Sequence, residues 1–396
     1  MNRNLWLMVA AQALFMTNNI VFVAVNGLVG LSIAPYAWLA TLPIMGYVVG
    51  GAVSTGPVAW TQARWGRRVS FQIGLVVACL SSLLAAWAVY TSNFWLLVVA
   101  TVIAGYYSAN GQLYRFAAAE LAKPNYRERA VSMVLAGGII GGVLGPNLAK
   151  WAQHTGSVPF VGAYAALTVV ALVAMLVVAQ VEFPPVPPKQ KGGAGGRPLS
   201  EIMRQPVFIV STAAAAFGYG VMNLLMAASP IAMKICGHPF ADAALVLEWH
   251  IIGMFAPGFF TGHLIKRFGA IPVMAAGVVL NLICIGIALE GIEVANFVVS
   301  MFLVGVGWNF LFTAGTAISL NAYRPEEKDK AQGAINFCVF LMMMASSLSS
   351  GALVTTQGWR LLNHISLVPV MITGVIVLWY VLYVLRGRGG GRGSPA

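Results

Sequence analysis

Long apolar segments recur along the whole of this sequence and restrict what it can fold into. A helix needs about 20 apolar residues to cross the roughly 30 Å hydrocarbon core of a bilayer. Twelve segments of suitable length can be traced in the chain of 396 residues. They lie near residues 5–31, 36–58, 70–90, 94–117, 131–153, 158–181, 206–235, 240–265, 271–290, 294–320, 331–356 and 360–386. The sequence therefore predicts an all-α polytopic membrane protein with twelve transmembrane helices.

The composition agrees with a protein whose main solvent is lipid. Charged residues make up 9% of the chain, whereas soluble domains carry about 25%. The net charge is +12, but the basic residues are scattered through short loops, which argues against nucleic acid as a partner. The four cysteines lie far apart, without the spacing of a zinc site or a disulfide framework. The sequence has no phosphate-binding loop motif, so we do not expect ATP to drive its function. We also do not expect an enzyme.

A proline- and glycine-rich segment divides the chain into two parts. Residues 1–183 are expected to form a first half of six helices, and residues 206–386 a second half of six. Residues 184–205 read as a flexible cytoplasmic linker, because their Pro, Gly and Lys residues suit neither a membrane span nor a core. Residues 387–396 form a cytoplasmic tail.

The positions of the basic residues predict the orientation of the helices. Of the 23 Lys and Arg residues, 20 fall at the amino terminus, after even-numbered helices or in the tail. Lys150, Lys234 and Arg360 fall on the other side. By the positive-inside rule, both termini and the linker face the cytoplasm. The amino terminus shows no convincing cleavage site, so the first apolar segment reads as a retained helix.

A short basic string recurs at equivalent places in the two halves. Arg-Trp-Gly-Arg-Arg at 64–68 follows the second helix, and Lys-Arg-Phe-Gly at 266–269 follows the eighth, six helices later. This internal repeat resembles the signature loop of the major facilitator superfamily, and the resemblance covers essentially the whole chain. It implies a secondary transporter whose two halves alternate access to a central site. The acidic position of the signature is Ala63 in the first copy and Lys266 in the second, so the usual charge lock is not expected there.

The fifth helix carries a string of glycines, Gly-Gly-Ile-Ile-Gly-Gly-Val-Leu-Gly-Pro at 137–146. It is similar to the glycine-proline motif of proton-coupled drug exporters, which favours an exporter of lipophilic compounds as an alternative function. Small residues four apart also let two helix backbones approach closely in lipid, and close packing explains the string as well.

Polar residues inside the spans are expected to hydrogen-bond between helices. Those in question are Asn18, Asn19, Asn110, Gln112 and Asn309. Arg115 and Glu120, near the cytoplasmic end of the fourth helix, are expected to pair with each other or with the next loop.

A group of sulfur and imidazole side chains occupies the seventh and eighth helices. Met222 and Met226 are four residues apart, as are His250 and Met254, so each pair lies on one helical face. Met226 and His250 are both twelve residues from His238 in the connecting turn. Two antiparallel helices would thus place both pairs at equal depths, within the membrane.

These donor types suit a soft cation. Thioether sulfur selects Cu(I), imidazole also suits copper, and uncharged ligands avoid the cost of a carboxylate in hydrocarbon. Met pairs at helical spacing are more often packing residues, but a histidine deep in a span marks a functional site by default. His250 can equally be a structural histidine or a proton carrier.

The turn between these helices offers a second candidate metal site. Met233, Cys236 and His238 lie within six residues and would form an outer capture site, although an incidental loop thiol explains them as well. Glu248, beside His250, is the candidate for proton coupling, or else a solvated interfacial residue.

The paired Met-x-x-x-Met and His-x-x-x-Met motifs resemble those of the CcoA-type copper importers of bacteria. The resemblance implies that Met222, Met226, His250 and Met254 carry copper into the cytoplasm, assisted by Cys236, for haem-copper oxidase assembly. It further implies a monomer in the bacterial cytoplasmic (inner) membrane, copper as substrate with no tightly bound cofactor, and a cytoplasmic copper chaperone as partner. A third hypothesis is a membrane sensor or assembly factor that does not transport.

Overall fold

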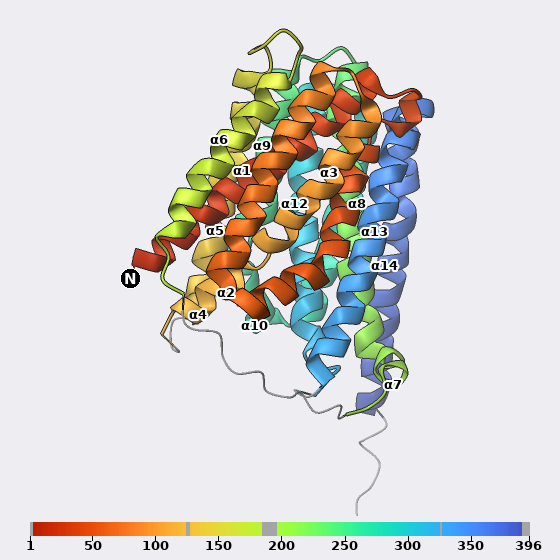
Figure 1. Ribbon diagram of the computed structural model, residues 1–396. Helices are drawn as coiled ribbons and strands as arrows, with labels where there is room; N and C mark the ends of the chain where they lie inside the picture. Colours follow the sequence, from red (N-terminus) through yellow and green to blue (C-terminus); the bar gives the residue numbers. More distant parts are fainter. Residues whose placement is uncertain (1–2, 124–126, 184–195, 325–326, 390–396) are drawn as a thin grey trace, which may run out of the picture.

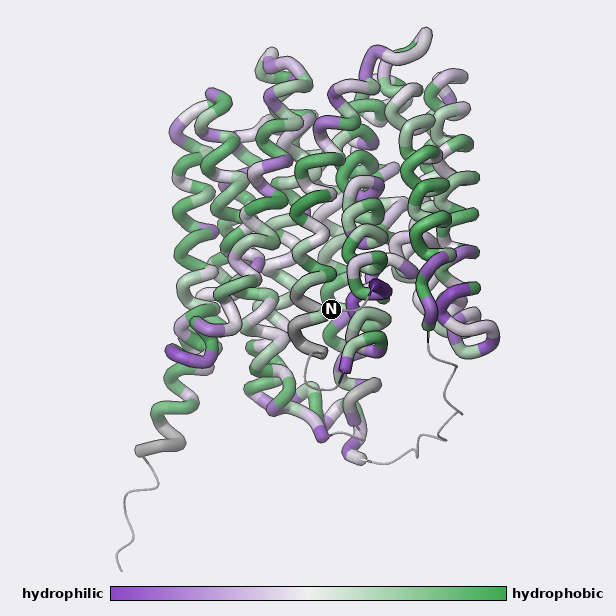
Figure 2. The backbone as a smooth tube through the Cα atoms, turned by 90° about the vertical axis from the view of Figure 1, so that its left-hand side faces the viewer, coloured by the Kyte–Doolittle hydropathy of each residue, from purple (hydrophilic) through white to green (hydrophobic). Residues whose placement is uncertain are grey.

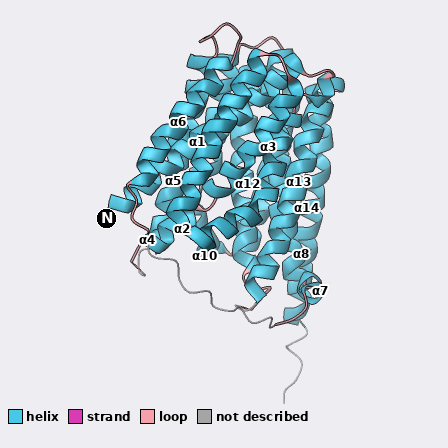
Figure 3. Cartoon of the chain, viewed as in Figure 1, coloured by secondary structure: helices cyan, strands magenta, loops and turns pink. Residues whose placement is uncertain are grey.

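The structure is a computed structural model that describes residues 3–123, 127–183, 196–324 and 327–389. Helices account for nearly all of the described part, and no strand occurs in it (Figure 3). The long helices run side by side, and their hydrophobic bodies end in more polar turns (Figure 2). The predicted all-α membrane fold is confirmed.

The first half of the bundle contains six crossings, and the fourth is broken into two helices. Its elements are α1 (Arg3–Ile33), η1 (Ala37–Leu39), α2 (Leu42–Tyr90), α3 (Phe94–Gly111), α4 (Tyr114–Leu121), α5 (Arg127–Ala152) and α6 (Val161–Ala179).

The second half repeats this arrangement after a short helix, with its second crossing broken. Its elements are α7 (Leu199–Met203), α8 (Pro206–Ile235), α9 (Phe240–Phe255), α10 (Gly258–Phe268), α11 (Ala270–Glu290), α12 (Val294–Ser319), α13 (Lys328–Thr356) and α14 (Gly358–Gly389).

Helix α2 accounts for two crossings, because its backbone leaves the helical region at Gly66. Eleven stretches are long and apolar enough to cross a membrane in the described part, and one of them, 54 residues long, contains this break. Gly66 has φ 81° and ψ 170°, and Gly269 in the second half has φ 91° and ψ 163°. Glycine alone adopts this conformation readily. The two copies of the basic string therefore make the same turn, which supports twelve crossings in two repeats.

The two halves meet along seams near the end of the bundle opposite the linker. Phe160 packs edge-to-face on Phe240, with ring centroids 5.2 Å apart. The backbone N–H of Gly351 on α13 donates to Thr41 Oγ1, 3.0 Å away. By the orientation that the basic residues predict, this is the outer side, and it is closed in this structure.

The glycine string of α5 serves two of these packing surfaces. A β-carbon on Gly137 or Gly141 would lie 2.6 or 2.5 Å from the carbonyl oxygens of Val9 or Ala13 on α1. Gly142 faces Ile251 on α9, in the other half. The close-packing interpretation of the string is therefore sufficient, since each face lets a different helix approach.

On the cytoplasmic side, Glu120 pairs with Arg67 and not with Arg115. The Nε of Arg67 donates to Glu120 Oε2 at 2.6 Å, and its Nη2 donates to the other oxygen. This pair joins α4 to the turn at Gly66, so the expected pairing within the fourth helix is wrong.

Two of the polar residues inside the spans form hydrogen bonds between helices, as expected. Asn110 accepts from Ser70 Oγ at 3.0 Å, and Asn309 donates to the Met254 carbonyl at 2.8 Å.

The end of the predicted linker is held against the second half. Residues 184–195 lie outside the described part, but residues 199–203 form α7, which the sequence did not predict. Arg197 binds the fully buried Glu327 through its backbone N–H at 2.7 Å, Nε at 3.0 Å and Nη2 at 2.8 Å. The N–H of Arg324 donates to the same carboxylate at 3.0 Å. This clamp fixes the point at which the chain enters the second half.

The Arg197 guanidinium, and then the Arg324 N–H, hold the pKa of Glu327 well below its usual range. A lowered folded-state pKa stabilises the fold at every pH above about 4.3 and loses this effect only as the pH falls through the lowered value. Glu327→Gln is therefore expected to lower the melting temperature of the purified protein at pH 7. Glu201→Gln is the control, because Glu201 is exposed and lies 3.9 Å from Arg197, where an ion pair contributes little. Equal melting temperatures for the two variants would contradict a stabilising role of the clamp.

Candidate functional site

The four predicted metal ligands are placed in the protein interior, not toward lipid. Met222 and Met254 are buried members of the main hydrophobic core, and Met226 packs against it. However, α12 packs extensively on both α8 and α9, while α8 also packs on α13 and α9 on α5. The equal distances of the two pairs from His238 predicted that α8 and α9 face each other. Instead, each of these helices packs more extensively on α12. Copper ligation by the two pairs stays a prediction.

His250 is fully buried, and its ring is turned toward α12. Its Nδ1 lies 2.7 Å from the carbonyl oxygen of Met301, which can only accept, so Nδ1 carries the proton. Nε2 is buried without a hydrogen-bond partner in the described part of the chain. The imidazole is thus held as a neutral ring with one free acceptor nitrogen. Such a nitrogen can ligate a metal or accept a proton.

The residues of the predicted outer capture site differ in burial. Met233 is fully buried, whereas His238 is half-buried, with Nε2 2.7 Å from the carbonyl oxygen of Ile292. Cys236 is a partly exposed free thiol at the end of α8. Among the described residues, no three His, Cys, Asp or Glu side chains are grouped for a metal. The role of these residues in metal capture stays a prediction.

Glu248 lies in the seam between the halves. Its carboxylate accepts a hydrogen bond of 3.3 Å from Asn147 Nδ2 on α5. This contact must break when the outer side opens, so its position is compatible with a role in coupling. The predicted proton transfer by Glu248 stays a prediction.

An aromatic cluster that the sequence analysis did not single out lies midway along the second half. The rings of Trp308 and Phe312 on α12 are stacked, with centroids 5.3 Å apart and planes at 14°. Tyr219 on α8 packs edge-to-face on both rings, at 5.3 and 5.7 Å. Phe255, at the end of α9, lies 6.5 Å from Trp308. Three different helices thus contribute to one aromatic surface.

This aromatic cluster faces the first half of the bundle. A β-carbon on Gly138 of α5 would lie 3.4 Å from Met16 on α1 and 3.7 Å from the Phe255 ring. Met16 directly follows Phe15 on α1, and the Phe15 ring packs edge-to-face on that of Tyr114, the neighbour of Arg115 on α4, with centroids 5.9 Å apart. This junction of the aromatic cluster with α1, α4 and α5 is the central site between the halves.

The regular helical hydrogen-bond pattern is interrupted next to this central site, between α3 and α4 in the fourth crossing and between α9 and α10 in the eighth. The backbone stays in the right-handed helical region at both places, so each crossing continues as one span. Pro257, which cannot donate a backbone hydrogen bond, accounts for the second interruption. From the sequence, Arg115 is expected to form an ion pair or a loop contact near the cytoplasmic end of this helix, so sequence reasoning missed it as a site residue.

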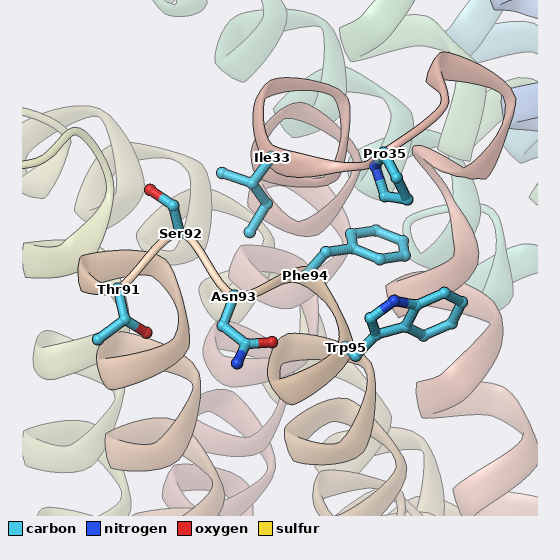
Figure 4. Close-up of a pocket in the computed structure, with 7 residues that line it drawn as sticks. All are labelled: Ile33, Pro35, Thr91, Ser92, Asn93, Phe94 and Trp95. Carbon is cyan, nitrogen blue, oxygen red and sulfur yellow. The ribbon is translucent and has the colours of Figure 1, made fainter.

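Two recesses open at the outer end. One, of about 380 Å³, is lined by the first half alone, by Ile33, Pro35, Thr91, Ser92, Asn93, Phe94 and Trp95 (Figure 4). The other, of about 230 Å³, lies between the halves, and its lining includes Phe160, Phe240, Lys234 and His238. Only the second lies over a seam that must open to admit a substrate from outside.

Two six-helix repeats around a central site are typical of secondary transporters. The comparison with protein families agrees with this class. Residues 5–257 and 212–395 match the model of the Major Facilitator Superfamily. The chain belongs to this superfamily. It is therefore a multi-pass secondary transporter and not an enzyme.

Relatives within the major facilitator superfamily cover the whole chain. The riboflavin transporter RfnT of Brucella anthropi is 35% identical over 400 residues, which span 100% of this chain and 98% of the relative. The uncharacterized transporter YddS of Bacillus subtilis is 25% identical over 86% of this chain and 82% of its own length. Among solved structures, a D-xylose-proton symporter covers 95% of this chain and 96% of its own, with a TM-score of 0.75 at 15% identity. That last likeness concerns the fold alone.

Proposed function

We propose that this major facilitator protein imports riboflavin, or a flavin of closely similar structure, across the bacterial cytoplasmic membrane. The observation that carries the proposal is the full-length similarity to a riboflavin transporter at 35% identity. The central site fits such a substrate, because a flat aromatic ring system binds well on stacked and edge-on aromatic side chains. Closure of the outer seams behind the substrate, followed by opening toward the cytoplasm, completes one cycle of alternating access.

The proposal is tested by uptake of radiolabelled riboflavin in a bacterial strain that neither makes nor imports it. Expression of the protein is expected to give saturable uptake and to restore growth on low external riboflavin. The control is the same strain with an empty vector, and detergent size-exclusion chromatography verifies that the protein is folded. A folded protein that gives no uptake above the control would overturn the riboflavin proposal.

Copper import is the second candidate, and the free Nε2 of His250 is the observation that favours it. In this alternative, Cu(I) passes between His250 and the buried thioethers of Met222 and Met254 and reaches a cytoplasmic chaperone. Uptake of radioactive copper that is lost in His250→Ala, while riboflavin has no effect, would support copper. Copper uptake equal to that of the empty vector removes this candidate.

No structural observation favours the exporter alternative. The glycines that suggested it have packing partners on α1 and α9. Drug resistance conferred by the protein, without riboflavin or copper uptake, would restore that interpretation.

A further inference from the structure

Two buried hydrogen-bond donors lie at the central site. Trp308 is 8% exposed, and its Nε1–H has no hydrogen-bond partner in the described part of the chain. The Nε–H of Arg115 is likewise buried without a partner among the described residues. An indole and a guanidinium can only donate. Both groups are therefore buried donors without an acceptor among the described side chains, and a bound ligand can supply one.

The two donors come from opposite halves of the transporter. Arg115 is on α4, where its neighbour Tyr114 packs on Phe15 of α1, and Trp308 is on α12, where it lies beside Phe255, the ring that faces Gly138 of the first half. A ligand that accepts from both donors would bridge the halves. Its binding would then be coupled to their relative position, as alternating access requires.

The aromatic rings restrict the shape of such a ligand. Trp308 and Phe312 form a stacked pair, Tyr219 meets both edge-on, and Phe255 adds a further ring from α9. A planar ring can pack on this surface, and in-plane acceptor atoms on its edge can reach donors beside it. A flexible polyol matches this arrangement less well. Each of its hydroxyl groups also donates a hydrogen bond, and the aromatic rings supply no good acceptor for it.

We infer that Arg115 and Trp308 determine specificity by donating to the carbonyl-bearing pyrimidine edge of a flavin ring, which the aromatic cluster holds. This inference rests on the proposed riboflavin transport and specifies which part of the substrate is recognised. The ring and its carbonyl edge are the recognised features, and the sugar-alcohol chain contributes less. A site built around buried donors rejects analogues that lack the matching acceptors.

Competition with riboflavin uptake by the wild-type protein tests the inference without any variant. Lumichrome keeps the tricyclic ring and both carbonyls but lacks the ribityl chain, and it is expected to compete. Phenazine, a tricycle without carbonyls, and ribitol, the chain alone, are expected not to compete at equal concentration. Equal competition by phenazine and lumichrome would overturn the role of the carbonyl edge. Competition by ribitol alone would assign recognition to the chain.

Two variants then test the donors directly. Trp308→Phe keeps an aromatic ring and removes the donor, and Arg115→Met keeps an unbranched apolar stem and removes the charge and its donors. Each is expected to raise the KM for riboflavin by about tenfold and to narrow the preference for lumichrome over phenazine. The matched control is Trp359→Phe, a buried tryptophan on α14 that packs on Phe297, outside the aromatic cluster.

The outcomes separate the inference from the proposed function. Wild-type protein without riboflavin uptake overturns both. Wild-type uptake with Trp308→Phe and Arg115→Met indistinguishable from Trp359→Phe overturns the inference and leaves riboflavin transport standing. If a variant does not fold, competition of lumichrome, phenazine and ribitol with riboflavin uptake by the wild-type protein tests the inference.

Discussion

Gly142→Val is expected to leave the protein folded in the membrane but to lower uptake of its substrate by about tenfold or more. Gly142 is on the face of α5 that meets α9, where an added β-carbon would overlap the Cγ2 of Ile251 and lie 3.1 Å from its Cβ. Overpacking of this kind costs about 1–3 kcal/mol, or roughly a 5- to 150-fold change in an equilibrium. Because the contact joins the two halves, this cost falls on the state in which the outer side is closed.

Uptake in cells, together with size-exclusion chromatography of the detergent-solubilised protein, measures the effect. Gly286→Val is the matched control, since a β-carbon on Gly286 of α11 meets nothing within 4 Å. We expect it to transport at the wild-type rate. Wild-type uptake by Gly142→Val would show that this seam does not need to close tightly during transport.

Gly50→Ala is expected to remove almost all folded protein from the membrane. A β-carbon on Gly50 would overlap the carbonyl oxygen of Val102 on α3, and Gly105 lies as close against α2 from the other side. Backbone atoms of two long helices cannot yield as a flexible side chain can. The added methyl group must therefore separate α2 from α3, which pack together more extensively than any other pair of described helices.

The neighbouring residue supplies the control for this prediction. A β-carbon on Gly51 would lie 3.7 Å from the nearest atom, the carbonyl oxygen of Gly105, which is an ordinary contact. Gly51→Ala is expected to match the wild type in membrane yield and melting temperature. Similar yields of folded protein for the two alanine variants would show that α2 and α3 are not locked by this contact.

The candidate site contains one residue that the sequence indicated and several that only the packing of the helices brings together. His250 was identified because a polar ring in an apolar span is costly, and the structure does bury it. Its partner, the Met301 carbonyl on α12, is 51 residues away in the chain and has no side-chain signal. Tyr219, Phe255 and Trp308 went unnoticed, because aromatic residues are common in membrane helices and only packing shows which of them meet.

The sequence by itself determined the membrane fold and the repeated turns, and it predicted the bounds of the two halves and their orientation. These properties follow from local chemistry: apolar length against bilayer thickness, basic residues in alternate loops, and glycine where the backbone requires it. The tertiary structure alone decided which residues meet. It packed α12 on both helices of the predicted metal hairpin, paired Glu120 with Arg67, and brought Phe255 of the aromatic cluster against Gly138 of the other half. Those contacts depend on how distant helices pack, and helical spacing fixes only the face on which a residue lies.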